Sequence, residues 1–189
     1  GRDARVLVRL AVCFAVLTAA VLPAAARDDA AATQDASTPQ RTDAELKKVG
    51  EARLRVLFWS IYNSRLYTPT GSYAGEERPL RLEIEYLIDV KSSALVDRTA
   101  REWDAMGREH PRQDAWLTRL DQLWPNIDKR DVLTLEVSED DVSTFFHNGT
   151  LLGRIDDAAF GEQFLDIWLS EDSTRPSLRE ALIGATDAD

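Results

Sequence analysis

Cysteine and histidine are nearly absent from this sequence of 189 residues, and their scarcity excludes several kinds of site. The single cysteine, Cys13, lies in an apolar run near the N-terminus, so one chain cannot form a disulfide or a cysteine-based metal site. His110 and His147 are not at metal-ligand spacing from each other or from Cys13. The acidic residues 139–141 lack the staggered spacing of a calcium loop. We therefore expect no metal, no cofactor and no catalytic thiol.

Phosphate-binding signals are also missing. The sequence has no glycine-rich phosphate loop and no basic cluster with interleaved aromatic residues. It has 33 acidic and 23 basic residues, which give a formal net charge of −10. Because such a surface repels nucleic-acid backbones, nucleic acid is not expected as a partner.

The first 26 residues have the pattern of a secretory signal peptide. Arginines at positions 2, 5 and 9 precede an apolar run over residues 10–22, and alanines at 24–26 provide small residues for cleavage. The run is short for a membrane span, so we expect no stable span after cleavage; a buried helix is the alternative. The expected location is the periplasm or the exterior of a bacterial cell.

Removal of residues 1–26 would leave 20 basic and 32 acidic residues and a net charge of −12. Residues 27–44 are mostly small and polar without an apolar period, which predicts a flexible linker. The folded domain is then expected over residues 45–186.

The second half of that domain has the clearest local signals. Residues 131–137 alternate between apolar and polar side chains, as in a half-buried strand, and two further extended segments flank the turn sequence Asn148-Gly149. Asp157 is placed to cap a helix over residues 158–169, whose aromatic residues share one face. A short helix follows, with Pro176 in its first turn and Gly184 at its end.

The first half predicts strands and then a helix pair. Residues 50–67 suit one long bent strand or two joined strands, and residues 79–89 alternate cleanly. Ser92 or Ser93 is expected to cap a helix that ends at Met106, and Pro111 to open a helix ending near Trp124. Together these segments predict an α+β domain with an antiparallel sheet covered by helices on one face.

Aromatic residues are more numerous than simple patterning requires. They can form a filled core, or they can surround an apolar cavity in which tyrosine hydroxyls and cations bind the polar end of a ligand. The second possibility makes Tyr62 and Tyr86 candidate ligand-binding residues, together with the nearby cations Arg53, Arg55, Lys91 and Arg98.

The order and spacing of residues across the domain resemble the chalcone isomerase-like family, and within it the secreted bacterial branch. The resemblance rests on Gly50, Leu57-Phe58, Tyr62, Leu66-Tyr67, Leu82, Tyr86, Trp103, Asn148-Gly149, Gly153, Phe160, Phe164, Ile167-Trp168-Leu169, Pro176, Leu178-Arg179, Leu182 and Gly184. It implies an open-faced β-sandwich, in which helices are layered against a large antiparallel sheet. It also implies one of two activities: cyclisation of chalcones in the plant enzymes, or binding of fatty acids in the related plastid proteins.

The resemblance weakens at the positions that serve catalysis in the plant enzymes. Their threonine corresponds approximately to Leu57, their tyrosine and asparagine to Lys91 and Arg98, and their late threonine or serine to Ile167. Apolar groups cannot orient water or a carbonyl as hydroxyls do, so no catalytic residue is assigned.

Three hypotheses follow from the sequence. The first is a secreted, non-catalytic protein that binds a fatty acid or other small amphipathic ligand between sheet and helices. The second is an isomerase or intramolecular lyase that uses Tyr62, Tyr86 and a nearby arginine on an unknown substrate. The third is a structural envelope protein with a filled core and no ligand.

Overall fold

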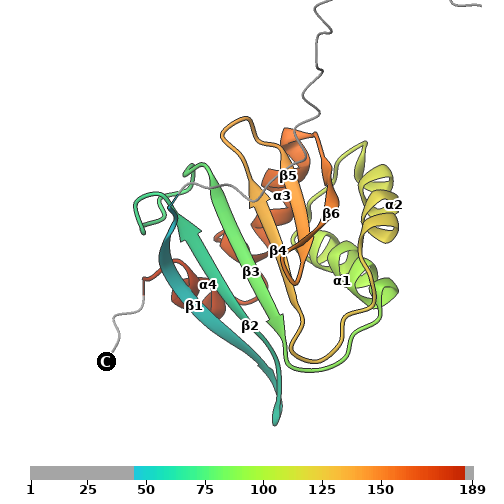
Figure 1. Ribbon diagram of the computed structural model, residues 1–189, viewed down its shortest axis with the longest axis horizontal. Helices are drawn as coiled ribbons and strands as arrows, with labels where there is room; N and C mark the ends of the chain where they lie inside the picture. The colour runs from blue at the N-terminus through green and yellow to red at the C-terminus, as the bar shows by residue number, and fades with distance from the viewer. Residues whose placement is uncertain (1–44, 186–189) are drawn as a thin grey trace, which may run out of the picture. The chain divides into compact units, whose positions relative to one another are not determined.

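The computed structural model describes residues 45–185, which fold as an open antiparallel sheet backed by helices (Figure 1). The predicted signal peptide and the whole of the predicted linker lie outside these residues, so both stay predictions. The elements, in chain order, are β1 (Lys47–Val56), β2 (Trp59–Thr68), β3 (Leu80–Tyr86), α1 (Ser92–Ala105), α2 (Gln113–Leu123), β4 (Val132–Val137), β5 (Ser143–His147), β6 (Thr150–Ile155), α3 (Ala158–Leu169) and α4 (Pro176–Leu182).

The sheet is a meander in which each strand pairs with the next one along the chain, β1 through β6. One helix pair, α1 and α2, lies between β3 and β4 in the chain, and the second pair, α3 and α4, follows β6. The sequence prediction of an α+β domain with an antiparallel sheet and helices on one face is therefore confirmed. Residues 50–67 form two joined strands, β1 and β2, which was one of the two alternatives left open by their pattern.

The core lies between the sheet and the helices. Strand alternation places Leu80, Leu82, Ile84 and Tyr86 of β3 on the helix-covered face, where each is less than 10% exposed. Their register with β4 sets Leu82 opposite Leu135, so apolar residues line up across neighbouring strands. Helix α3 contributes the aromatic stripe predicted from its sequence, and its members Phe160, Phe164 and Trp168 are buried.

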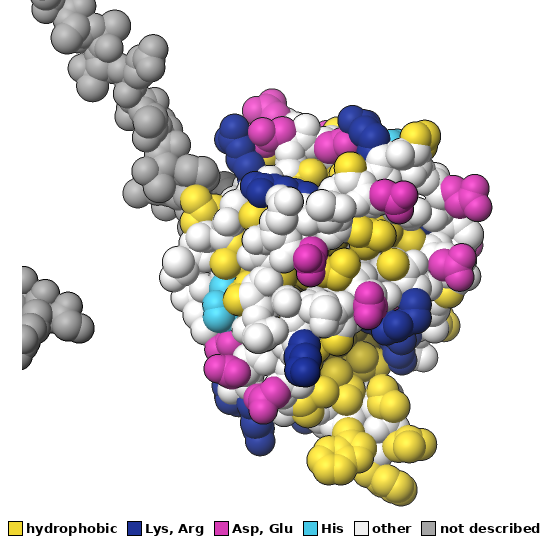
Figure 2. Space-filling model, turned by 90° about the vertical axis from the view of Figure 1, so that its right-hand side faces the viewer, with side chains coloured by type: hydrophobic (Ala, Val, Ile, Leu, Met, Phe, Trp, Pro, Cys, Tyr) yellow, Lys and Arg dark blue, Asp and Glu magenta, His cyan; other side chains and the backbone are white. Residues whose placement is uncertain are grey.

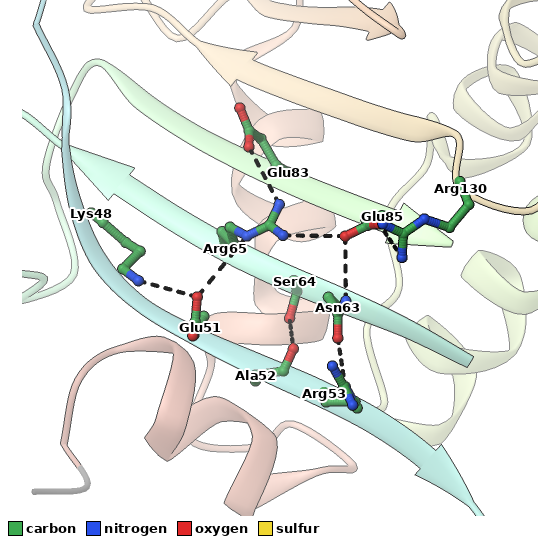
Figure 3. Close-up of polar contacts among 10 residues, drawn as sticks. All are labelled: Lys48, Glu51, Ala52, Arg53, Asn63, Ser64, Arg65, Glu83, Glu85 and Arg130. Carbon is green, nitrogen blue, oxygen red and sulfur yellow. Dashed lines mark hydrogen bonds and ion pairs between the residues drawn. The ribbon is translucent and has the colours of Figure 1, made fainter. Parts of the chain in front are cut away.

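Charged side chains form a network on the opposite face of the sheet (Figure 3). The carboxylate of Glu85 accepts hydrogen bonds from Arg65 Nη2 at 3.2 Å and Asn63 Nδ2 at 3.3 Å, and pairs with Arg130 at 2.8 Å. Burial of the carboxyl opposes ionisation, but these partners outweigh it and lower the pKa of Glu85. Arg53 joins the network by donating to Asn63 Oδ1 at 2.7 Å.

The predicted helix ends are partly confirmed. Asp157 caps α3 by accepting a hydrogen bond from Ala159 N–H, and Gly107 follows α1 with a positive φ of 64°. The prediction that Ser92 or Ser93 caps α1 is wrong, because Lys91 occupies the N-cap position without a side-chain hydrogen bond. Asn126 replaces the missing cap from a distant segment, since its Oδ1 accepts a hydrogen bond from Ser92 N–H at 3.1 Å.

Candidate ligand-binding cavity

A cavity of about 330 Å³ lies between the sheet and helices α1 and α3. This volume falls within the range of roughly 300–1,000 Å³ that small-molecule sites occupy. Most of the lining side chains are aliphatic or aromatic. They come from strands β1 to β4, from helices α1 and α3, and from the segments between them.

Regular backbone geometry brings the lining residues together. The strand register sets Leu54 of β1 opposite Tyr62 of β2, and Tyr62 opposite Tyr86 of β3, so one row of cavity-lining side chains crosses three strands. Helix α1 faces this row with Leu95, Arg98, Thr99 and Glu102, whose i, i+3, i+4, i+7 spacing places them on one side of the helix.

Two tyrosines form the polar part of the sheet side. The rings of Tyr62 and Tyr86 meet edge to face, with centroids 6.0 Å apart. Burial raises the pKa of Tyr62, and burial together with the neighbouring Tyr62 phenol raises the pKa of Tyr86. Both phenols therefore stay protonated at neutral pH and are available as hydrogen-bond donors.

The cations of the cavity differ in their partners. Arg98 forms an ion pair with the buried carboxylate of Glu102, which also accepts a hydrogen bond from Thr174 Oγ1 at 2.6 Å. Arg175, just before α4, also lines the cavity, but its guanidinium forms no ion pair or hydrogen bond with any residue of 45–185. Tyr62 lies near enough to both arginines for their charges to favour its ionised form. Arg175 thus supplies a cation without a counter-ion beside a buried phenol.

Two indole groups add potential donors. The Nε1–H groups of Trp124 and Trp168 are buried and have no hydrogen-bond partner within the described chain, and both residues line the cavity. The Trp168 indole approaches the Tyr62 hydroxyl without forming a hydrogen bond to it. An unpaired buried donor costs about 1–3 kcal/mol, which an acceptor on a bound molecule would relieve.

The structure brings together half of the six candidates chosen from sequence. Tyr62, Tyr86 and Arg98 line the cavity. Arg53 lies on the opposite face of the sheet in the network of Figure 3, whereas Arg55 and Lys91 are exposed and do not line the cavity.

Arg175 was not among the candidates chosen from sequence. Its place directly before Pro176 indicates the start of a helix, but not a position at the cavity. Nothing in the linear pattern connects this residue with Tyr62, more than a hundred positions earlier. The proximity of the two residues depends on how α4 and the preceding segment return to the first strands.

Leu57 and Ile167, which the family resemblance places near catalytic hydroxyls of the plant isomerases, carry no hydroxyl group. Leu57 is exposed at the turn between β1 and β2, and Ile167 lines the cavity with an aliphatic side chain. Within residues 45–185 no group of three or more histidine, cysteine or acidic side chains is arranged to hold a metal ion.

Comparisons with known proteins agree with this architecture. A Haemophilus influenzae protein described as uncharacterized is 27% identical over 143 residues, which is 76% of this chain and 70% of the relative. The crystal structure of an Arabidopsis thaliana fatty-acid binding protein superimposes with a TM-score of 0.53 at 13% identity, covering 77% of this chain and 90% of the plant protein. A family model described as chalcone isomerase-like matches residues 26–184. The chain therefore belongs to the chalcone isomerase-like family.

Proposed function

We propose that the exported form of this protein binds a fatty acid, or a similar amphipathic carboxylate, in the cavity between sheet and helices without transforming it. The observation that carries the proposal is the Arg175 guanidinium, which lies near Tyr62 in a mainly apolar cavity and has no ion-pair partner among residues 45–185.

The two ends of such a ligand match the two kinds of lining. An alkyl chain would contact Ile84, Leu133 and Phe164, which gain from excluding water. A carboxylate would pair with Arg175 and accept a hydrogen bond from Tyr62. Charge-assisted hydrogen bonds of this kind are roughly twice as strong as neutral ones, and more so where solvent is excluded.

The fold neighbour supports the proposal indirectly. The Arabidopsis structure carries the name of a fatty-acid binding protein, and its likeness to this chain is one of fold. In this chain the cavity itself and the cation Arg175 support the binding of an anionic ligand.

The isomerase hypothesis gains no comparable support. A general base near neutral pH must be able to lose its proton readily, and burial moves the pKa of Tyr62 and Tyr86 in the opposite direction. The two phenols are therefore better suited to donate hydrogen bonds to a bound group than to abstract a proton.

Calorimetric titration of the delipidated protein with palmitate tests the proposal. We expect one saturable site, and we expect Arg175→Gln to weaken binding about tenfold, because a charged hydrogen-bond donor is replaced by a neutral one. Arg154→Gln is the matched control, since Arg154 pairs with Asp156 on an exposed part of β6 and should leave affinity unchanged. Methyl palmitate, which lacks the anion, should bind the original protein and Arg175→Gln with similar affinity.

Two results would contradict the proposal. One is the absence of saturable palmitate binding, and the other is equal palmitate affinity for the original protein and Arg175→Gln.

A further inference from the structure

The turn between β1 and β2 exposes four consecutive apolar side chains, here called the apolar tip. Val56 is 46% exposed, Leu57 87%, Phe58 99% and Trp59 69%. Figure 2 shows apolar side chains gathered on a protrusion that extends beyond the body of the molecule. Single exposed apolar residues are common in proteins, but a contiguous group of large ones marks an interaction site.

Neither turn geometry nor core packing explains the composition of the tip. Leu57 has a φ of 55°, a conformation that glycine or asparagine adopts far more readily than leucine. A fully exposed Phe58 gains nothing from the fold. Small polar turn residues would close the same hairpin, so the large apolar residues point to a partner outside the chain.

We propose that the apolar tip inserts into the surface of a lipid bilayer that contains anionic phospholipids. The shape of the tip favours a bilayer over another protein. Phe58 and Trp59 would bury roughly 150–250 Å² each. Even with Val56 and Leu57 added, a narrow convex turn falls short of the roughly 800 Å² per partner that a standard protein interface buries. A bilayer accepts such a protrusion at its headgroup boundary, where tryptophan is favoured.

The charge around the tip is complementary to anionic headgroups. Residues 52–63 contain Arg53 and Arg55 but no acidic residue, in a chain whose net charge is −10. Arg55 is exposed next to the tip and has no ion pair with a described residue. The most strongly apolar protrusion of this acidic protein is thus flanked by positive charge, which attracts anionic lipid surfaces.

The tip is continuous with the cavity wall. Leu54, Val56 and Ile61, from the base of the same hairpin, line the cavity. Insertion of the tip would therefore set this part of the wall next to the acyl region of the bilayer. The docking does not depend on the proposed ligand, because the tip would partition into lipid with or without a molecule in the cavity.

Fluorescence of Trp59 tests the docking at the tip itself. The other four tryptophans, at positions 103, 116, 124 and 168, are buried, so Trp59 is the residue whose emission responds to a change from water to lipid. The full chain is mixed with vesicles of phosphatidylcholine and phosphatidylglycerol, with and without bromine-labelled acyl chains. A Trp59→Phe variant, which retains the four buried tryptophans, defines the signal to be subtracted.

We expect a blue shift of Trp59 emission and quenching by the bromine-labelled lipid. The variant L57S/F58S keeps Trp59 but shortens the tip, and its apparent partition coefficient should fall at least tenfold. Arg55→Gln should weaken binding a few-fold on anionic vesicles and leave binding to pure phosphatidylcholine unchanged. Palmitate titration of L57S/F58S should match the original protein, which separates this proposal from the ligand proposal.

Three outcomes would overturn the docking proposal. The first is Trp59 emission that does not change with either vesicle. The second is equal quenching in the original protein and L57S/F58S. The third is a tip-dependent dimer in analytical ultracentrifugation without lipid, which would assign the tip to a second copy of the chain.

Discussion

Arg175 is the residue that separates this cavity from an ordinary aromatic core. An arginine at the edge of an apolar cavity is commonly paired with an acidic side chain, which accepts charge-assisted hydrogen bonds from the guanidinium. Arg98 follows that rule through its ion pair with Glu102, whereas Arg175 has no such partner among the described residues. The difference makes Arg175 the natural contact for an anionic ligand, and Arg98 a cation already neutralised by the fold.

The side chain of Asp131 makes the stability of the fold depend on pH. Its carboxylate accepts hydrogen bonds from Asn148 Nδ2 and from Asp128 N–H and contacts the His147 ring, each at 2.8 Å. These contacts lower the pKa of Asp131 from 3.8 to about 2. Since the folded state holds the carboxyl ionised, its contribution to stability is present above about pH 4 and is lost as the pH falls through about 2.

We therefore expect Asp131→Asn to reduce the loss of unfolding free energy between about pH 4 and about pH 2, as measured by urea denaturation at a series of pH values. Asp156→Asn is the control, because Asp156 is half exposed and should leave the pH dependence unchanged. Identical dependence of the unfolding free energy on pH in the original protein and in Asp131→Asn would contradict the stabilising role of the Asp131 carboxylate.

At the scale of elements, the close approach of α4 to β1 is the contact most sensitive to a single added methyl group. Gly50 lies against the backbone of α4, and a Cβ at this position would lie 2.6 Å from the carbonyl oxygen of Leu182 and clash with that of Ala181. Neither oxygen can move without shifting the helix. The glycine therefore lets α4 pack directly on the first strand.

Gly50→Ala should lower the free energy of unfolding by about 3 kcal/mol or more, because overpacking against backbone atoms cannot be relieved by a side-chain rotation. Gly107→Ala is the comparison, since Gly107 has a positive φ but open space around its Cα. The free energy of unfolding of that variant should fall by only about 1–2 kcal/mol, because alanine is strained in the left-handed backbone conformation. Equal losses in thermal or urea denaturation would show that the α4 contact is looser than described.

The helices and strands that could be predicted from sequence are those whose pattern is local. Helices α1 and α3 and strands β3 and β4 were predictable because each has an amphipathic period that depends only on its own residues. The turn at Leu57 and Phe58 has none of the usual turn residues, so the sequence left one strand or two as alternatives. The cap of α1 was predicted wrongly because its acceptor, Asn126, belongs to a segment 34 residues away.

At the scale of the whole molecule, the sequence could predict the layers but not the space between them. Aromatic residues that fill a core and those that surround a cavity have the same pattern along the chain. Tyr62, Tyr86 and Arg98, three of the residues proposed from sequence as ligand-binding, line the cavity, and their role in binding stays a prediction. Arg53 and Arg55 alternate with the inward residues of β1 and so do not line the cavity, and Arg175 enters from the far end of the chain.

At this scale the apolar tip and the cavity adjoin each other in the folded domain. The apolar tip would place the protein at a lipid surface, and the cavity wall continues from the base of the tip. No helix among residues 45–185 is long and apolar enough to cross a membrane.

The most direct test of the account is whether a fatty acid reaches the cavity tryptophans. In a Trp59→Phe protein, Trp124 and Trp168 line the cavity while the remaining two tryptophans lie outside it. Titration with a bromine-labelled fatty acid should quench tryptophan emission saturably, with a plateau at one equivalent, and Arg175→Gln should shift the curve to higher concentration. Quenching that is absent, or that rises linearly without a plateau, would contradict the claim that this cavity binds a fatty acid.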